Sequence, residues 1–209
     1  MKQLFIWAPG RETALPQRWT LGAGETLSCC FIILPGVSVD LPLTVDITGE
    51  GASLELAGCW VCGADEKVSL TVRVNHLCGR SQSRQLFNGI AGGNDVTDFD
   101  GRIVIRPDAQ QVSAYQENHN ILYSETATVR TRPQLEIYAD DVQCSHGATT
   151  GRLSEDEQFY MRSRGIPEAE AKVLQMISFL SPVLAYVEDG ERPEVAALLE
   201  EAVRGLSAK

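Results

Sequence analysis

The chain has 209 residues and a formal net charge of −10 at pH 7, from 28 acidic and 18 basic side chains. No basic stripe interrupts this acidity, which argues against binding to nucleic-acid phosphates. No stretch approaches the roughly 20 apolar residues of a membrane helix, and the N-terminal MKQLFIWAPG lacks the apolar core of a secretory signal. We therefore expect a globular cytoplasmic protein that does not bind a membrane and whose cysteines are reduced.

Strands dominate the predicted structure up to about residue 150. Segments rich in Val, Ile, Leu and Thr are separated by Gly, Pro, Asn and Asp at the roughly 8–12-residue spacing of all-β folds. The clearest are TLSCCFIIL, VSVDLPLTVDIT, ASLELAGCWVC, KVSLTVRVNHL, GRIVIRPDA and ATVRTRPQLEIYA. No segment has a 3.6-residue period long enough for a crossover helix, which argues against a doubly wound sheet. A sandwich, a barrel and a β-helix remain open, although repeated turn–strand–turn units suit a stack of parallel strands.

Helices are predicted in the last quarter of the chain. Ser154 followed by Glu157 is a capping box, in which the two side chains satisfy free backbone N–H groups. Gly165 provides a left-handed stop for the first helix, and Gly205 is expected to close the last one. The expected helices span about 154–164, 167–181 and 193–204. The two predicted parts are a β domain and a small helical domain, over residues 1–150 and 151–209.

The six cysteines are Cys29, Cys30, Cys59, Cys62, Cys78 and Cys144. Cys59 and Cys62 form a lone CxxC at the end of a strand, whereas a redox motif of this type needs a helix N-terminus. A structural zinc site needs a second pair, and the adjacent Cys29 and Cys30 point to opposite faces of a strand. Buried thiols are therefore expected, with a metal site and redox chemistry as the alternatives.

His76 and Cys78 form a thiol–imidazole pair two residues apart, for which a functional role is the alternative, but His76 is expected to pack at a strand end. His119 in QENHNILYS is expected to lie in a turn. The sequence contains no GxxxxGK[ST] phosphate loop, no GxSxG elbow and no HExxH zinc motif. We therefore do not expect the chain to hydrolyse ATP by itself.

The third histidine lies in PQLEIYADDVQCSHGATTG, residues 133–151. If this stretch is extended, Cys144 and His146 lie on one face of a strand, and both can reach one metal ion. A thiolate and an imidazole suit zinc, iron or copper(I). Two ligands do not complete a site, so the others must come from elsewhere in the fold or from another subunit.

Two acidic residues, Asp140 and Asp141, precede this pair. They are expected to raise the pKa of the Cys144 thiol and to favour bound cations. Together with His146 they could also form the acid–base set of a β-helical carbohydrate-active enzyme. Adjacent acids on a strand point to opposite faces, which argues against a paired-carboxylate site.

The longer stretch PQLEIYADDVQCSHGATTGRLSEDEQFYMRSRGI, residues 133–166, closely resembles the C-terminal block of the SufB/SufD family and is nearer to SufD. The same family is resembled, in the same order, by SRQLFNGI, FDGRIVI, DAQQVSAYQENHNILYSETATVRTRPQLEIYADD and the terminal helices. The resemblance is specific over about residues 81–185 and looser over residues 1–80. It implies a right-handed parallel β-helix followed by a small helical domain.

The resemblance also implies a function. SufB and SufD pair through the ends of their β-helices, the helical domain of each binds the ATP-binding-cassette ATPase SufC, and the complex builds iron–sulfur clusters. The histidine of the CSHG motif lies at the SufB interface and is implicated in cluster assembly. This position is His146 here, with Cys144 beside it, so a partner would supply the missing ligands of a transient cluster.

The block FYMRSRGI leads into the ATPase-binding region of the family. We therefore expect Phe159, Tyr160, Arg162 and Arg164 to bind a SufC-like ATPase; the alternative is that the two aromatic residues only pack the helices onto the β domain. Full-length members carry an N-terminal helical region, so we expect a shortened form without it. The predicted function is a non-catalytic scaffold subunit, paired with a SufB-like subunit or a second copy. The alternative is a self-associating structural β-helix without cluster chemistry.

Overall fold

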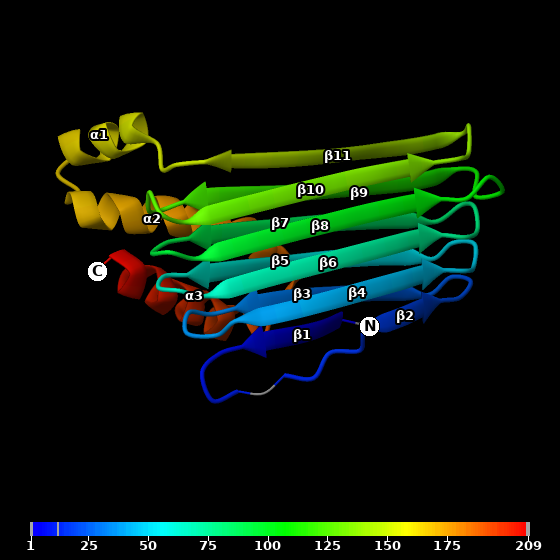
Figure 1. The fold of residues 1–209 in the computed structure, drawn as a ribbon, viewed down its shortest axis with the longest axis horizontal. Helices are drawn as coiled ribbons and strands as arrows, with labels where there is room; N and C mark the ends of the chain where they lie inside the picture. Colours follow the sequence, from blue (N-terminus) through cyan, green and yellow to red (C-terminus); the bar gives the residue numbers. More distant parts are fainter. Residues whose placement is uncertain (1, 12, 208–209) are drawn as a thin grey trace.

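The computed structural model describes residues 2–11 and 13–207. Consecutive strands alternate between two parallel sheets that face each other, so the chain coils as a parallel β-helix (Figure 1). The odd-strand sheet contains β1 (Lys2–Trp7), β3 (Thr26–Ile33), β5 (Ser53–Cys62), β7 (Gln82–Ala91), β9 (Val112–Leu122) and β11 (Val142–Gly151). The even-strand sheet contains β2 (Arg18–Leu21), β4 (Val39–Ile47), β6 (Lys67–His76), β8 (Val96–Ile105) and β10 (Thr128–Ile137). The predicted fold class is confirmed, and a sandwich and a barrel are excluded.

The even-strand sheet has one buried face, as its alternating sequence predicts. In β6 the apolar side chains of Leu70, Val72 and Val74 are buried, whereas Arg73 between them is exposed. These side chains pack into an inner core between the two sheets, together with residues such as Leu56 of β5. A period of two is what a strand with one face on a core requires.

The odd-strand sheet is buried on both faces where helices cover it. In β3 the side chains of Cys29 and Phe31 point into the inner core, whereas Cys30 and Ile32 point outward into a second apolar cluster. Strands buried on both faces read as nearly continuous apolar runs. This explains why TLSCCFII does not alternate.

The outer apolar cluster is completed by three of the C-terminal helices, α2 (Glu168–Leu180), the 3-10 helix η1 (Ser181–Tyr186) and α3 (Arg192–Ser207). The fourth, α1 (Glu155–Ser163), lies beyond the end of β11 in Figure 1 and has no buried residue. Met176, Val183 and Val203 are fully buried against the sheet. The guanidinium of Arg204 joins α3 to α2 through a bidentate ion pair with Glu170, at 2.8 and 3.1 Å.

The predicted start and stop of α1 are confirmed. The Ser154 hydroxyl accepts a hydrogen bond from the Glu157 backbone N–H at 3.3 Å, and Gly165 has a φ of +88°. The glutamate does not complete the capping box in the expected way, because its carboxylate accepts a hydrogen bond from the Gln175 side chain of α2 at 2.7 Å. The cap therefore also joins α1 to α2.

The predicted end of the last helix is wrong. Gly205 lies inside α3, which continues to Ser207. Leu206 is the reason: its side chain is buried over Gly63 and Gly92, where an added Cβ would lie only 2.8 and 2.7 Å from the Leu206 Cδ1. Burying this leucine stabilises one more helical turn than the local sequence indicates.

The change from strands to helices occurs between Gly151, at the end of β11, and Glu155, at the start of α1. The division into domains over residues 1–150 and 151–209 stays a prediction. Among the described residues, no helix combines the length and the apolar character needed to cross a membrane.

Candidate functional site

The last turn of the β-helix leaves two strand edges free within the described part of the chain. β11 pairs only with β9, and β10 pairs only with β8, so each is the final strand of its sheet. Figure 1 shows both strands at the upper end of the coil, far from β1 and β2. We call the surface formed by β10 and β11 the open end.

The predicted ligand pair lies on β11 at this open end. Cys144 is in register with Ala114 of β9, and His146 is in register with Gln116. The side chains of Ala114 and Gln116 are buried inside the β-helix, so Cys144 and His146 face the same interior side of their strand. Cys144 is half-buried against the inner core, and His146 is exposed. The prediction that Cys144 and His146 share one face of the strand is therefore confirmed, and this face is accessible at the open end.

Burial raises the pKa of the Cys144 thiol, and a backbone hydrogen bond at Ala114 partly offsets this. The expectation that Asp140 and Asp141 raise it was wrong in its cause, because desolvation accounts for the shift. Both acids are exposed in the loop after β10, where the backbone N–H of Asp141 donates to the Gln110 side chain at 2.8 Å. The loop thus shapes the turn into β11.

The described chain brings no third ligand to this pair. Within residues 2–11 and 13–207, no group of three or more His, Cys, Asp and Glu side chains is placed to hold a metal ion. Cys144 and His146 fit a thiolate–imidazole ligand set in residue type and in direction. They can contribute two ligands to a metal or cluster, and the other ligands would have to come from outside these residues.

The other two histidines do not face the open end. His76 is buried between the hydroxyls of Ser81 and Ser83, at 2.8 and 2.9 Å, and desolvation lowers its pKa to about 4. Its predicted packing at a strand end is confirmed. His119 lies in β9, so the predicted turn is wrong; its ring bonds the Thr149 hydroxyl of β11 at 2.8 Å on the outward face.

Most of the cysteines are buried as free thiols. Cys29 and Cys62 belong to the inner core, whereas Cys30 and Cys59 belong to the outer cluster. The two thiols of the CxxC therefore lie on opposite sides of the odd-strand sheet. Burial raises the pKa of Cys29 and Cys30 to about 12, which disfavours the thiolate that metal or redox chemistry needs. Cys78 is half-buried.

A row of amide side chains inside the β-helix was not predicted. Gln85, Gln116, Asn118 and Asn120 are all buried, and we call them the polar ladder. The Gln116 side chain donates to the Gln85 side chain at 2.9 Å, and Asn120 donates to Asn118 at 2.8 Å. The sequence signal that could have predicted the polar ladder is the alternation of amides in QENHN, residues 116–120. We interpreted this polar segment as a turn, whereas in a strand its alternate side chains point to one face.

The residues predicted to bind an ATPase lie on a helix without buried positions. Phe159 and Tyr160 of α1 are 73% and 60% exposed. The Arg164 guanidinium lies 5.4 Å from the Tyr160 ring centre, and Arg162 pairs with Glu168 at 3.5 Å. The alternative that the two aromatics pack the helices onto the β domain is wrong, because both rings point into solvent.

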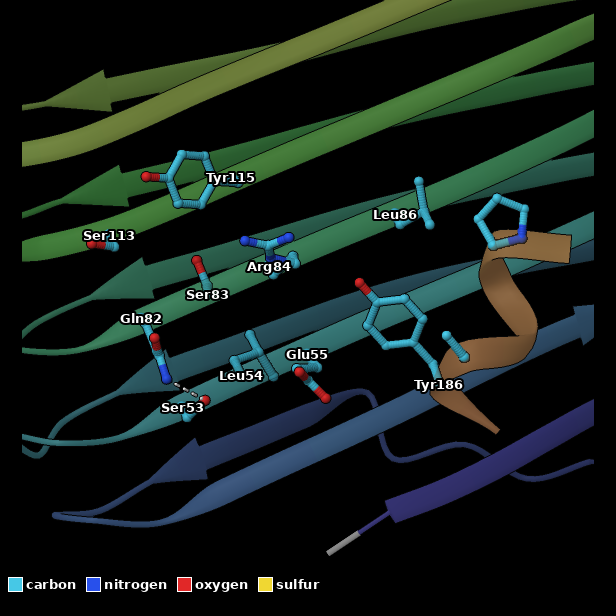
Figure 2. A pocket seen from close by; sticks show the side chains of 12 residues that line it. Ser53, Leu54, Glu55, Gln82, Ser83, Arg84, Leu86, Ser113, Tyr115 and Tyr186 are labelled. Atoms are coloured by element: carbon cyan, nitrogen blue, oxygen red, sulfur yellow. Dashed lines mark hydrogen bonds between the residues drawn. The ribbon is translucent and has the colours of Figure 1, made fainter. Parts of the chain in front are cut away.

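A groove on the outward face of the odd-strand sheet is shown in Figure 2. It lies between η1, represented by Tyr186, and the outward side chains of Glu55, Arg84 and Tyr115 on β5, β7 and β9. The Arg84 guanidinium lies 5.6 Å from the centre of the Tyr115 ring. Cys144 faces the interior, so it does not contribute to this groove.

Comparison with known proteins identifies the family. Residues 16–179 match the sequence model described as "SUF system FeS cluster assembly, SufBD core domain". The chain belongs to the SufBD core family. The matched region extends from just before β2 to the end of α2, and it therefore includes the open end and α1.

Three relatives illustrate the similarity to SufBD proteins. "Iron-sulfur cluster assembly protein SufD" of Escherichia coli (strain K12) is 32% identical over 174 residues, which cover 83% of this chain and 41% of the relative. The protein of the same name from Bacillus subtilis (strain 168) is 27% identical over 94% of this chain and 43% of its own. "Protein ABCI7, chloroplastic" of Arabidopsis thaliana is 34% identical over 76% of this chain and 33% of its own. The chain thus spans less than half the length of these relatives.

Proposed function

We propose that this chain is a non-catalytic scaffold subunit of a SUF-type iron–sulfur cluster assembly complex in the cytoplasm. Its membership of the SufBD core family supports this role, as do relatives named iron–sulfur cluster assembly proteins. The observation that carries the proposal is the position of Cys144 and His146. Both face the interior side of the last strand, at an end of the β-helix where nothing in the described chain completes their ligand set.

The proposed partner covers the open end. The free edges of β10 and β11 present unpaired backbone groups, which natural proteins cover or pair. Inward-facing apolar side chains at this end are only partly covered: Leu135 and Val142 are half-buried, and Ile137 is 42% exposed. The end of a second β-helix, from a SufB-like subunit or from another copy of this chain, would bury these groups.

The cargo of the proposed site is an iron–sulfur cluster, held transiently. Thiolates are the usual ligands of such clusters, and an imidazole can replace a thiolate. Cys144 would supply one ligand and His146 a second, and the covering subunit would supply the others. An incomplete set on each subunit fits a cluster that is assembled at an interface and then passed on.

The ATPase partner would dock on α1. The exposed rings of Phe159 and Tyr160, flanked by Arg162 and Arg164, form a surface patch of the residue types that dominate binding hot spots. A SufC-like ATP-binding-cassette ATPase is the proposed occupant. The described chain itself contributes no phosphate-binding loop to this activity.

The alternative function is a self-associating structural β-helix without cluster chemistry. The same free strand edges and apolar side chains favour it, since they favour pairing whether or not a cluster is bound. The two functions differ only in whether Cys144 and His146 are needed.

Anaerobic reconstitution separates the two functions. The chain would be mixed with Fe²⁺, sulfide, a SufB-like subunit and a SufC-like ATPase, and visible absorption would be recorded for wild type, His146→Ala and Cys144→Ala. We expect cluster absorption in wild type and its loss in both variants. Ser145→Ala is the matched control, because Ser145 lies between the two on β11 and faces outward, opposite Tyr115. Absorption that survives both substitutions, in a complex that still forms, favours the structural alternative.

A further inference from the structure

His146 lies at the end of a row of side chains that runs through the interior of the β-helix. Parallel pairing places Gln85 of β7 beside Gln116 of β9, and Gln116 beside His146 of β11. Neighbouring strands are about 4.8 Å apart, and in-register side chains on one face stack above one another. The imidazole is therefore the outermost member of the row to which the two glutamines belong.

Side chains in neighbouring strands of this sheet do bridge from one strand to the next. The Gln116 Nε2 donates to the Gln85 Oε1 at 2.9 Å, between β9 and β7. On the outward face, the ring of His119 on β9 bonds the hydroxyl of Thr149 on β11 at 2.8 Å. A hydrogen bond between Gln116 and His146 needs the same span.

Gln116 has an unused acceptor for such a bond. Its Nε2 is used toward Gln85, and its Oε1 is buried without a hydrogen-bond partner. Buried acceptors are rarely left unpaired, because they lose their bonds to water. The free oxygen belongs to the side chain next to His146, whose neutral ring carries one N–H donor.

The opposite wall of the β-helix is shaped around this amide. Gly101 on β8 faces Gln116, and a Cβ added there would lie 2.5 Å from the Gln116 Oε1 and 2.6 Å from its Nε2. Any side chain at position 101 would displace the amide. The absence of a Cβ at Gly101 therefore leaves the space that the Gln116 amide occupies.

We propose that Gln116 is a positioning residue for His146. In this role its Oε1, which has no partner in the structure, would accept the N–H of one imidazole nitrogen once the exposed ring of His146 turns toward it. This bond would fix the tautomer and the ring orientation and direct the other nitrogen toward the open end. Ligating histidines commonly donate their second N–H to an oxygen in this way. Cys144 has no equivalent side-chain support, because its neighbour on β9 is Ala114. This role rests on the proposed function of His146 as a ligand.

The direct test is the tautomer of His146 in the 209-residue chain. Long-range proton–nitrogen NMR at about pH 8.5, above the ordinary histidine pKa, reports which ring nitrogen carries the hydrogen. We expect one fixed tautomer in wild type and a mixture in Gln116→Met, which keeps the length but removes the acceptor. Gln116→Glu restores an acceptor and is expected to restore the single tautomer. Gly101→Ala is expected to produce the mixture while Gln116 is still present.

Asn120→Leu is the matched control for the loss of a buried amide. Asn120 lies on the same strand, is buried and also has an unpartnered side-chain oxygen, but its neighbour on β11 is Thr150. Its substitution is expected to lower the melting temperature without changing the His146 tautomer. A tautomer of His146 that is unchanged in Gln116→Met, or already mixed in wild type, overturns the proposal.

Reconstitution of the complex with Fe²⁺ and sulfide then tests the ligand role of His146 separately from the positioning role of Gln116. We expect Gln116→Met to weaken iron retention about 10–100-fold, the range for second-sphere substitutions, and Asn120→Leu to leave it unchanged. If His146→Ala retains the cluster, the ligand role fails even when the tautomer depends on Gln116. If His146→Ala loses the cluster but Gln116→Met does not, the positioning role fails and the ligand role stands.

Discussion

At the scale of single residues, two carboxyl groups are buried side by side in the stacked turns of the β-helix. Asp95 accepts hydrogen bonds from the backbone N–H groups of Glu66 and Gly92, at 2.8 and 3.1 Å. Burial, followed by its hydrogen bond and charge interaction with Glu66, raises the pKa of Asp95 to about 7. Burial alone would raise the pKa of Glu66, but hydrogen bonds from Asp95 and the backbone lower it to about 2. The pair therefore shares one proton over a wide pH range.

This pair predicts that stability falls as the pH rises from mildly acidic to neutral. The folded-state pKa of Asp95 lies above its ordinary value, so the folded state binds the extra proton, and this contribution is lost as pH rises through about 7. We expect the free energy of unfolding from urea titrations to fall between about pH 5 and pH 7 in wild type and to level off above this range, because Asp95 is then ionised in both the folded and the unfolded state. Asp95→Asn cannot ionise and is expected to flatten this dependence. Asp108→Asn, at an exposed position, is the control that keeps it; an equal slope in Asp95→Asn would contradict the shared proton.

At the scale of elements, local sequence signals predicted helix boundaries correctly except where a residue distant in sequence packs against the boundary. Ser154 and Gly165 act on the backbone within a few residues of themselves, so the helix boundaries that they predicted are present in the structure. Gly205 failed as a stop because Leu206 is buried on Gly63, which is distant in sequence. His119 failed as a turn residue because the amides around it point into the β-helix, where the polar ladder pairs them. In both cases a tertiary contact overrode a local preference.

The exposure of α1 gives a prediction for ATPase binding. Deleting all the helices is an ambiguous test, because Ile32 and Ile90 of the sheet would lose their cover. Phe159→Ala combined with Tyr160→Ala removes exposed rings, so we expect little change in melting temperature. Hot-spot truncation typically weakens binding at least about tenfold, which calorimetry with a SufC-like ATPase would measure.

Tyr138→Ala is the matched control for this pair. Tyr138 is also an exposed aromatic residue, at 58%, but it lies in the loop between β10 and β11, at the opposite end of the strands from α1 (Figure 1). We expect it to bind the ATPase as wild type does. Unchanged binding by the double variant would remove α1 from the docking surface.

At the scale of the whole molecule, the open end gives a prediction for pairing. Ile137, at the end of β10, faces inward in register with buried Ile105 yet is 42% exposed. We expect Ile137→Lys to weaken the binding of a second copy of this chain, or of a SufB-like subunit, about tenfold or more, because the ammonium must be desolvated in the interface. Light scattering after size exclusion would measure the mass of the complex. Gln134→Lys adds the same charge on the outward face of β10 and is the control; equal weakening by both would indicate a general charge effect.

The stacking of the β-helix turns decides which side of β11 Cys144 and His146 face, and the spacing of these two residues does not. The spacing of Cys144 and His146 was sufficient to place both on one strand face. Which face it was depended on the register with Ala114 and Gln116, about 30 residues earlier in the chain. The same register decided that His119 lies on the other side of the sheet and cannot join them. A slip of one residue would have reversed every one of these directions.

The sequence alone determined the strand-rich class, the helical C-terminus, the shared face of Cys144 and His146, and the family resemblance, because these depend on residue types and on spacings of a few positions. Only the tertiary structure decided which side of each strand is interior, that α1 leaves Phe159 and Tyr160 exposed, and that Gln116 lies beneath His146. Those facts depend on how successive turns of the coil stack. Side chains about 30 residues apart become neighbours there, and no local pattern encodes which of them will meet.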